Sequence, residues 1–292
     1  MEIPRTLRMP DGAAIAYRVT PAASPRPGRA LVLVHGLASN LTRWSEFVAH
    51  TPLAARWDLV RVDLRGHGGS PWSGPLTLER WADDLAAVLE HEGHPRGVVV
   101  GHSLGAQVAL VFAARHPGRT AGIVLIDPLF REALRGRAVW IARCGPLFRA
   151  AAALVRGANA LGLARRHIPA LDLAELDREA RKALASARDT EAFVRRYSSP
   201  RADLRTFRTA NYLAELAEMF RRAPPLETLR APALLILSRG GTFADPALTQ
   251  QVAAGFADAE IVMIDAEHWP LTERPVEVRQ AIADWCARRP LV

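Results

Sequence analysis

The sequence has little cysteine, and it lacks both a long apolar run and a leader-like start. Its only cysteines, Cys144 and Cys286, stand far apart and without the spacing of metal ligands. Two isolated thiols predict a reduced, cytoplasmic protein in which both thiols are buried. No apolar run approaches the length of a membrane span, which predicts no stable membrane insertion. The first five residues lack the charged-then-apolar order of a signal peptide, which agrees with the predicted cytoplasmic location.

The sequence also lacks the patterns with which proteins hold cofactors and nucleic acids. It has no glycine-rich phosphate loop and no cluster with metal-ligand spacing, so we expect neither a metal nor an organic cofactor. No helix-turn-helix, zinc-binding or aromatic-interleaved basic pattern occurs, so we expect no nucleic-acid partner. Hydrophobic residues make up 49% of the 292 residues, which is enough for a large globular core.

Positive charge is almost entirely arginine, because Lys182 is the only lysine. The net charge is +8, and residues 128–228 hold 19 Lys and Arg against 11 Asp and Glu, while the rest of the chain has 19 of each. The excess therefore lies in one central block. A solvated helical surface is the simplest interpretation of this block. Attraction of an anionic substrate, an acidic acyl carrier protein or a membrane surface is the alternative.

Strand-like apolar runs alternate with helix-like segments through most of the chain. Strands are predicted at residues 6–9, 13–19, 31–34, 59–62, 97–100, 122–126, 233–237 and 260–264. Asp11-Gly12 between the first two predicts an antiparallel hairpin. Helices are predicted at residues 41–50, 77–91, 106–116, 246–255 and 274–287. This alternation predicts an α/β fold with a mostly parallel central sheet flanked by helices on both faces.

The alternation stops between residues 129 and 228. This block is rich in Ala, Arg and Leu, and glycines and prolines break its helical periods. It predicts about four helices inserted into the α/β pattern. We therefore expect a core domain formed by residues 1–128 and 229–292, with a helical cap, or lid, at residues 129–228.

The most informative motif is Gly101-His102-Ser103-Leu104-Gly105, between a predicted strand and a predicted helix. A serine at the tip of such a sharp turn needs small neighbours, and the two glycines let the strand and the helix approach closely. The N-terminus of the following helix can stabilise negative charge beside the serine. A G-x-S-x-G sequence in this context predicts that Ser103 is a nucleophile.

The chain contains three more motifs, two before this turn and one after it, and the order of all four makes the pattern specific. They are His35-Gly36-Leu37, the run Asp-Leu-Arg-Gly-His-Gly-Gly-Ser at residues 63–70, and Glu267-His268-Trp269-Pro270 with the Glu-Arg-Pro that follows at residues 273–275. With them the chain resembles the α/β-hydrolase superfamily, in its serine-nucleophile branch with a helical cap. The resemblance covers nearly all the chain except the cap.

The resemblance implies roles for several residues. His268 would be the base that activates the serine, since a hydroxyl is a poor nucleophile alone. The backbone N–H groups of Leu37 and Leu104 would form the oxyanion hole. The family usually employs His35 and His102 structurally, and we place both at the edge of the substrate pocket. Trp140, from the apolar part of the cap, and Trp269, beside the base, are the other candidate pocket residues, although packing of the cap onto the core explains Trp140 equally simply.

The carboxylate that orients the base departs from the family pattern. Most relatives carry it a few residues after the strand at 233–237, where this chain has Gly241. Asp245 comes later and directly precedes Pro246, which is typical of a helix N-cap. Asp127, at the end of the preceding strand, is the position that some α/β-hydrolases use. We therefore predict Asp127 as the acid of the triad, with Asp245 as the alternative.

These residues predict a hydrolase that cleaves a carboxylic ester through an acyl-serine. The substrate would be a small-molecule ester of medium size or, given the displaced acid, a lactone. Some relatives cleave C–C bonds of diketone-like substrates with the same triad. Others act as ligand receptors without turnover. Both remain alternatives at this point.

Overall fold

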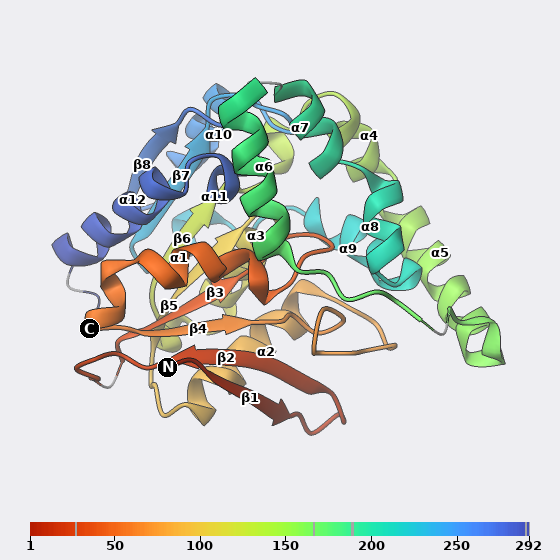
Figure 1. Ribbon diagram of the computed structural model, residues 1–292, viewed down its shortest axis with the longest axis horizontal. Coiled ribbons are helices and arrows are strands. Elements are labelled where there is room, and N and C mark those ends of the chain that lie inside the picture. The colour runs from red at the N-terminus through yellow and green to blue at the C-terminus, as the bar shows by residue number, and fades with distance from the viewer. Residues whose placement is uncertain (27, 166, 188–189, 290, 292) are drawn as a thin grey trace.

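The computed structural model describes residues 1–292 except 27, 166, 188–189, 290 and 292. Its centre is one eight-stranded sheet with the order β1-β2-β4-β3-β5-β6-β7-β8 (Figure 1). β1 and β2 form an antiparallel hairpin, β2 pairs antiparallel with β4, and all the other neighbours are parallel. The strands are β1 Ile3–Arg8, β2 Ala14–Thr20, β3 Ala30–Val34, β4 Asp58–Val62, β5 Gly97–His102, β6 Thr120–Ile126, β7 Ala233–Ser238 and β8 Ala259–Ile264. The predicted mixed sheet is confirmed.

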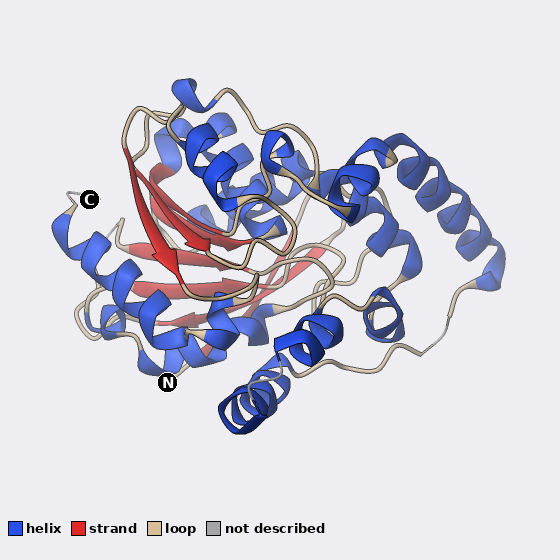
Figure 2. Cartoon of the chain, turned by 90° about the horizontal axis from the view of Figure 1, so that it is seen from above, coloured by secondary structure: helices blue, strands red, loops and turns tan. Residues whose placement is uncertain are grey.

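The central strands are apolar throughout because both faces of the sheet are covered. Every residue of β3, β5 and β6 is buried. Alternate residues of a strand point to opposite faces, so Val32 and Val34 pack with one helical layer and Leu31 and Leu33 with the other. Figure 2 shows the helices on both sides of the sheet.

Six α-helices flank the sheet. α2 and α3 cover one face, where Trp81 and Phe112 are buried, and α1 and α12 cover the other, where Phe47 and Trp285 are buried. α2 begins where its sequence predicts, because the side chain of Thr77 accepts a hydrogen bond from the N–H of Arg80. These helices are α1 Ser45–His50, α2 Leu78–His91, α3 Leu104–Arg115, α10 Pro246–Ala253, α11 Pro270–Glu273 and α12 Pro275–Arg288. The first half of the helix predicted at 41–50 is a 3₁₀ helix, Leu41–Trp44.

The segment between β6 and β7 is helical but more finely divided than the sequence indicates. Six α-helices are described where about four are predicted, and the bounds are α4 Arg137–Arg143, α5 Gly145–Ala158, α6 Leu173–Ala187, α7 Thr190–Tyr197, α8 Pro200–Thr206 and α9 Thr209–Met219. Gly157, one of the glycines expected to break a helix, lies inside α5. A π-helical turn, Asn159–Leu163, follows α5 and contains Gly162 at φ 89°. α9 returns this segment to the core by packing against α3.

No single helix among the described residues has both the length and the apolar composition of a membrane span. α4 together with α5 and its π-helical turn has this length and composition, but the two parts are bent by 64° to each other.

Candidate active site

Ser103 lies at the sharp turn between β5 and α3. Its φ of 53° and ψ of −112° are strained for a residue with a side chain. The glycines around it are required by close backbone contact. A Cβ at Gly101 would lie 2.1 Å from the carbonyl oxygen of Gly105, and one at Gly105 would lie 2.4 Å from that of Val34. The motif therefore brings the strand and the helix together around Ser103, which is buried and lines a cavity.

His268 lies in the loop after β8, and its Nε2 is 3.1 Å from the Oγ of Ser103. A second histidine holds this loop, because the Nε2 of His102 donates to the carbonyl oxygen of His268 at 2.8 Å. Burial keeps both rings neutral: it lowers the pKa of His102 to about 4 and that of His268 well below its usual range. A neutral imidazole facing the serine is the form that can accept its proton.

Asp127 follows β6, and its Oδ2 lies 3.7 Å from the Nδ1 of His268. That separation is too long for a direct hydrogen bond, but it places the carboxylate beside the imidazole. The carboxylate is held from the next strand, where Ser238 donates its backbone N–H at 2.7 Å and its hydroxyl at 2.6 Å. Burial raises the pKa of Asp127 to about 7, against the opposing effect of the two bonds from Ser238.

Asp245 serves as a helix cap. Its Oδ1 accepts from the N–H groups of Ala247 and Leu248 at 2.9 and 3.0 Å, at the start of α10. The N-cap interpretation of Asp245 is confirmed, and none of its side-chain contacts among the described residues goes to His268. The structure therefore brings Asp127, and not Asp245, to the base.

The two predicted oxyanion-hole donors are the backbone N–H groups of Leu37 and Leu104. That of Leu104 is the first of α3 and has no acceptor within the helix. That of Leu37, in the loop after β3, donates to none of the residues that the structure describes. Leu37 lines the same cavity as Ser103, and Leu104 follows Ser103 directly at the start of α3.

The loop that carries Leu37 is fixed by a residue that the sequence did not single out. Ala38 adopts φ 45°, and its N–H donates to the Oε2 of Glu215 at 3.0 Å. Glu215 belongs to α9 and is fully buried. Its other oxygen lies 3.0 Å from the Nε2 of His67. Burial opposes a charged imidazole at His67, but Glu215, together with a hydrogen bond to the backbone carbonyl of Arg65 and the charge of Asp63, raises the pKa of His67. Nothing in the local pattern of α9 distinguishes Glu215 from its neighbour Glu218, so only the fold identifies it.

A cavity of about 150 Å³ adjoins Ser103. Its apolar wall includes Met219, whose Sδ is 3.9 Å from the Oγ of Ser103. The lining combines apolar side chains from the core and from the helices between β6 and β7, among them Leu129, Ile141, Leu216, Met219, Phe220, Phe243 and Trp269, with polar side chains that include Arg43, Tyr197, Ser198, Asp203 and Tyr212. The cavity can therefore hold a partly apolar group of modest size beside Ser103.

The structure divides the predicted pocket residues. Trp269 and His102 line the cavity. His35 does not: it is fully buried, and its Nε2 accepts from the N–H of Leu64. Trp140 is also outside, because it lies on the outer face of α4 and is 66% exposed. Assigning Trp140 and His35 to the pocket is therefore incorrect, since one residue faces outward and the other supports a core loop.

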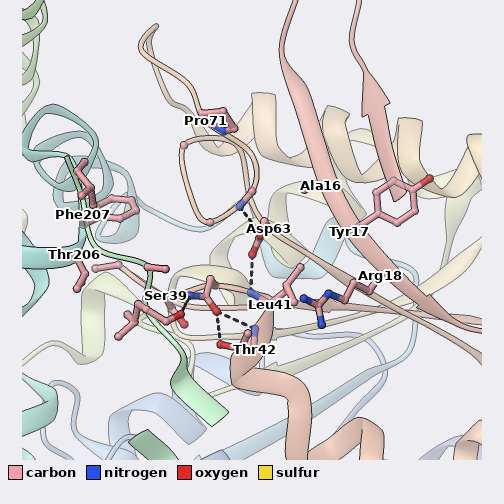
Figure 3. A pocket seen from close by; sticks show the side chains of 18 of the residues that line it. Ala16, Tyr17, Arg18, Ser39, Leu41, Thr42, Asp63, Pro71, Thr206 and Phe207 are labelled. Carbon is pink, nitrogen blue, oxygen red and sulfur yellow. Dashed lines mark hydrogen bonds between the residues drawn. The ribbon is translucent and has the colours of Figure 1, made fainter. Parts of the chain in front are cut away.

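A larger pocket, of about 700 Å³, lies near the β1–β2 edge and contains none of the residues of the Ser-His-Asp group. Figure 3 shows Asp63 at its centre. The carboxylate of Asp63 accepts from the N–H groups of Leu41 and Gly69, both at 2.7 Å. Asp63 thus ties together the loop that contains Leu41 and the loop that contains Gly69. Ser39 lines both this pocket and the cavity beside Ser103.

Ligand atoms of His102, Asp127 and His268 lie within 4.8 Å of one another, a spacing that a metal ion could also use. In this structure the same side chains have other partners: His102 donates to a backbone carbonyl, Asp127 accepts from Ser238, and His268 faces Ser103. The donor set therefore fits acid–base chemistry at a serine.

The fold and this geometry are those of the α/β hydrolases, and the chain belongs to that family: residues 29–275 match the model of the alpha/beta hydrolase fold. It is similar to the lipase LipV of Mycobacterium tuberculosis, with 39% identity over 102 residues, which are 35% of this chain and 38% of that protein. It is also similar to a pimeloyl-acyl-carrier protein methyl ester esterase of Aromatoleum aromaticum, with 44% identity over 97 residues, 33% of this chain and 36% of that protein. The chain thus matches little more than a third of the length of either relative.

Among solved structures, a hydrolase from Pseudomonas aeruginosa superposes with a TM-score of 0.70 at 25% identity. That likeness covers 97% of this chain and 98% of the other, so it extends to the inserted helices as well as the sheet.

Proposed function

We propose that this protein is a serine hydrolase that cleaves a carboxylic ester through an acyl-serine intermediate. The observation that carries the proposal is the 3.1 Å contact between the Oγ of Ser103 and the Nε2 of a buried, neutral His268. The relatives named as a lipase and as a methyl ester esterase support ester substrates, as does the partly apolar cavity beside the serine.

In the proposed reaction, the Oγ of Ser103 attacks the ester carbonyl carbon while the Nε2 of His268 takes the hydroxyl proton. The N–H groups of Leu37 and Leu104 donate to the oxyanion. Collapse of the tetrahedral intermediate breaks the bond to the alcohol, which leaves with the proton from His268. Water then attacks the acyl-serine by the same steps and releases the acid. Asp127 stabilises the imidazolium that forms twice in this cycle.

A panel of p-nitrophenyl esters and lactones, with the Ser103→Ala protein as blank, tests this proposal. We expect turnover of short and medium esters that is absent from the blank. Turnover of lactones in preference to esters would identify a lactonase. Diketone cleavage without ester turnover would indicate a C–C hydrolase, and no turnover of any substrate would favour a ligand receptor.

The pH dependence of the reaction is predicted from the site. Asp127 must be ionised to stabilise the imidazolium, and burial raises its pKa to about 7. We therefore expect kcat/KM to rise with pH through about 7. The hydroxyl of Ser238 lowers this pKa, so Ser238→Ala should move the acidic limb to higher pH. Thr242→Val is the matched control, since that hydroxyl bonds Glu267 instead. An unmoved limb in Ser238→Ala would contradict the role of Asp127.

Glu215 is predicted to be a positioning residue, acting through Ala38 on the N–H of Leu37. Glu215→Gln keeps the volume but removes the charge that faces His67, which weakens the hold on the loop. We expect kcat to fall about 10-fold or more, with KM little changed, because the oxyanion contact strengthens mainly in the transition state. Steady-state kinetics of this variant measure the effect.

Glu218→Gln provides the comparison for Glu215→Gln. Glu218 is equally embedded in α9, but its oxygens bond Leu78 and Arg221. We expect this variant to lose thermal stability without the fall in kcat. Equal losses of kcat in both variants would show that Glu215 acts only through stability.

A further inference from the structure

An exposed apolar stripe runs along α4, α5 and the π-helical turn. Trp140, Leu147, Leu154 and Leu161 recur every seven residues and are 66, 70, 76 and 83% exposed, and Leu163 beside them is 76% exposed. Large apolar side chains exposed in this number on one face indicate a surface that another body covers.

The opposite face of these helices is already occupied. Ala138 and Ala142 of α4 and Ala152 of α5 are buried, and Ile141 lines the cavity beside Ser103. α5 packs along α9. The stripe is therefore the outer side of a bent pair of helices whose inner side packs on the rest of the chain, and packing within the described residues does not account for it.

The segment that carries the stripe has charged residues of one sign only, although Arg149 is paired with Glu218 of the neighbouring α9. Residues 133–171 contain seven arginines and no aspartate or glutamate. The guanidinium carbon of Arg143 lies 5.3 Å from the centre of the ring of Trp140, at the edge of the stripe. Apolar side chains bordered by arginines and a tryptophan are the composition with which helices bind the interface of an anionic bilayer.

The position of these helices agrees with a flat partner. α5 and the π-helical turn after it project from the body of the molecule (Figure 1). α4 and α5 are bent by 64° to each other, so together they do not form a straight span. We propose that the outer face of α4, α5 and the π-helical turn binds the surface of an anionic phospholipid membrane.

This surface lies directly outside the site. Ile141 and Trp140 are neighbours on α4, one facing the cavity and the other facing outward. Membrane binding would hold the cavity next to the lipid phase and favour esters with acyl chains that partition into bilayers. This consequence rests on the proposed function, whereas the binding itself does not.

Flotation with phosphatidylcholine vesicles, with and without phosphatidylglycerol, tests the proposal. We expect the protein to float with the anionic vesicles, to bind the neutral ones more weakly, and to be released by salt. Leu147→Ser combined with Leu154→Ser should lower the partition coefficient about 10-fold or more. Arg137→Gln combined with Arg143→Gln should remove most of the preference for phosphatidylglycerol.

Val276→Ser is the matched control, since Val276 is 63% exposed on α12, outside the stripe, and its loss should leave binding unchanged. Ser103→Ala protein should float like the parent, so that a failure of catalysis cannot be mistaken for a failure of binding. Absence from the anionic vesicles, or equal binding by the double-serine variant, would overturn the proposal. A dimer that the double-serine variant converts to a monomer, or binding to an acidic carrier protein in place of vesicles, would overturn it too by assigning the stripe to a protein partner.

Discussion

Ser103→Ala is expected to lower kcat by roughly 10³-fold or more for any ester that the parent hydrolyses, because loss of the nucleophile removes the covalent route. Among the described residues, the hydrogen-bond partners of the hydroxyl are His268 and the sulfur of Met219, so its removal leaves the remaining site intact. Steady-state rates on the best ester of the panel measure the loss, and substrate affinity of the inactive protein should stay close to the KM of the parent.

Ser103→Gly separates catalysis from folding at the same position. Glycine adopts the φ of 53° without strain, so this variant should be as inactive as the alanine variant but at least as stable in thermal unfolding. Substantial activity in either variant would place the nucleophile elsewhere. A large loss of stability in Ser103→Gly would mean that the turn is not strained as the structure indicates.

Asp127→Asn is the second change with a large expected effect, a loss of about 10⁴-fold in kcat at neutral pH. The amide retains the shape of the side chain but removes the negative charge 3.7 Å from the Nδ1 of His268, so the imidazolium is no longer stabilised. It also removes the carboxyl group whose titration we assign to the acidic limb of kcat/KM. That limb should therefore be absent from the pH profile of the residual activity.

Asp245→Ala is the comparison for the triad acid. It removes two hydrogen bonds at the start of α10 and should cost about 1 kcal/mol of stability with little change in kcat. Near-full activity of Asp127→Asn, or a collapse of activity in Asp245→Ala at a temperature where the variant is folded, would reverse the assignment.

Much of the fold follows from local patterns. Apolar four-residue runs such as Leu31–Val34 form strands that are buried on both faces, and Asp11-Gly12 forms the hairpin turn, with Gly12 at φ 86°. The turn around Ser103 was also predictable, because two glycines at fixed spacing leave few alternatives to a close strand–helix approach. These features depend on neighbouring residues, which a sequence displays directly.

Features that depend on distant contacts were not predictable. From the sequence, Asp127 and Asp245 were both candidates for the acid that orients His268. The pairing of β6 with β7 brings Ser238 against Asp127. Nothing in the sequence distinguishes Glu215 from other helical glutamates. Its role depends on the contact of α9 with the loop at Ala38. Trp140 was assigned to the pocket because apolar residues are expected to face inward, yet it is 66% exposed on the outer face of α4. The phase of a helix relative to its neighbours is set by tertiary packing and not by its own sequence.

Covalent labelling with a fluorophosphonate, followed by mass mapping of the peptides, tests the central claim most directly. The reagent reacts with a serine that a neighbouring base activates, so it reports the nucleophile without requiring the natural substrate. We predict one adduct, on the hydroxyl of Ser103, that is absent from Ser103→Ala and forms much more slowly in Asp127→Asn. No adduct on the folded protein, or an adduct on another serine that persists in Ser103→Ala, would contradict the account.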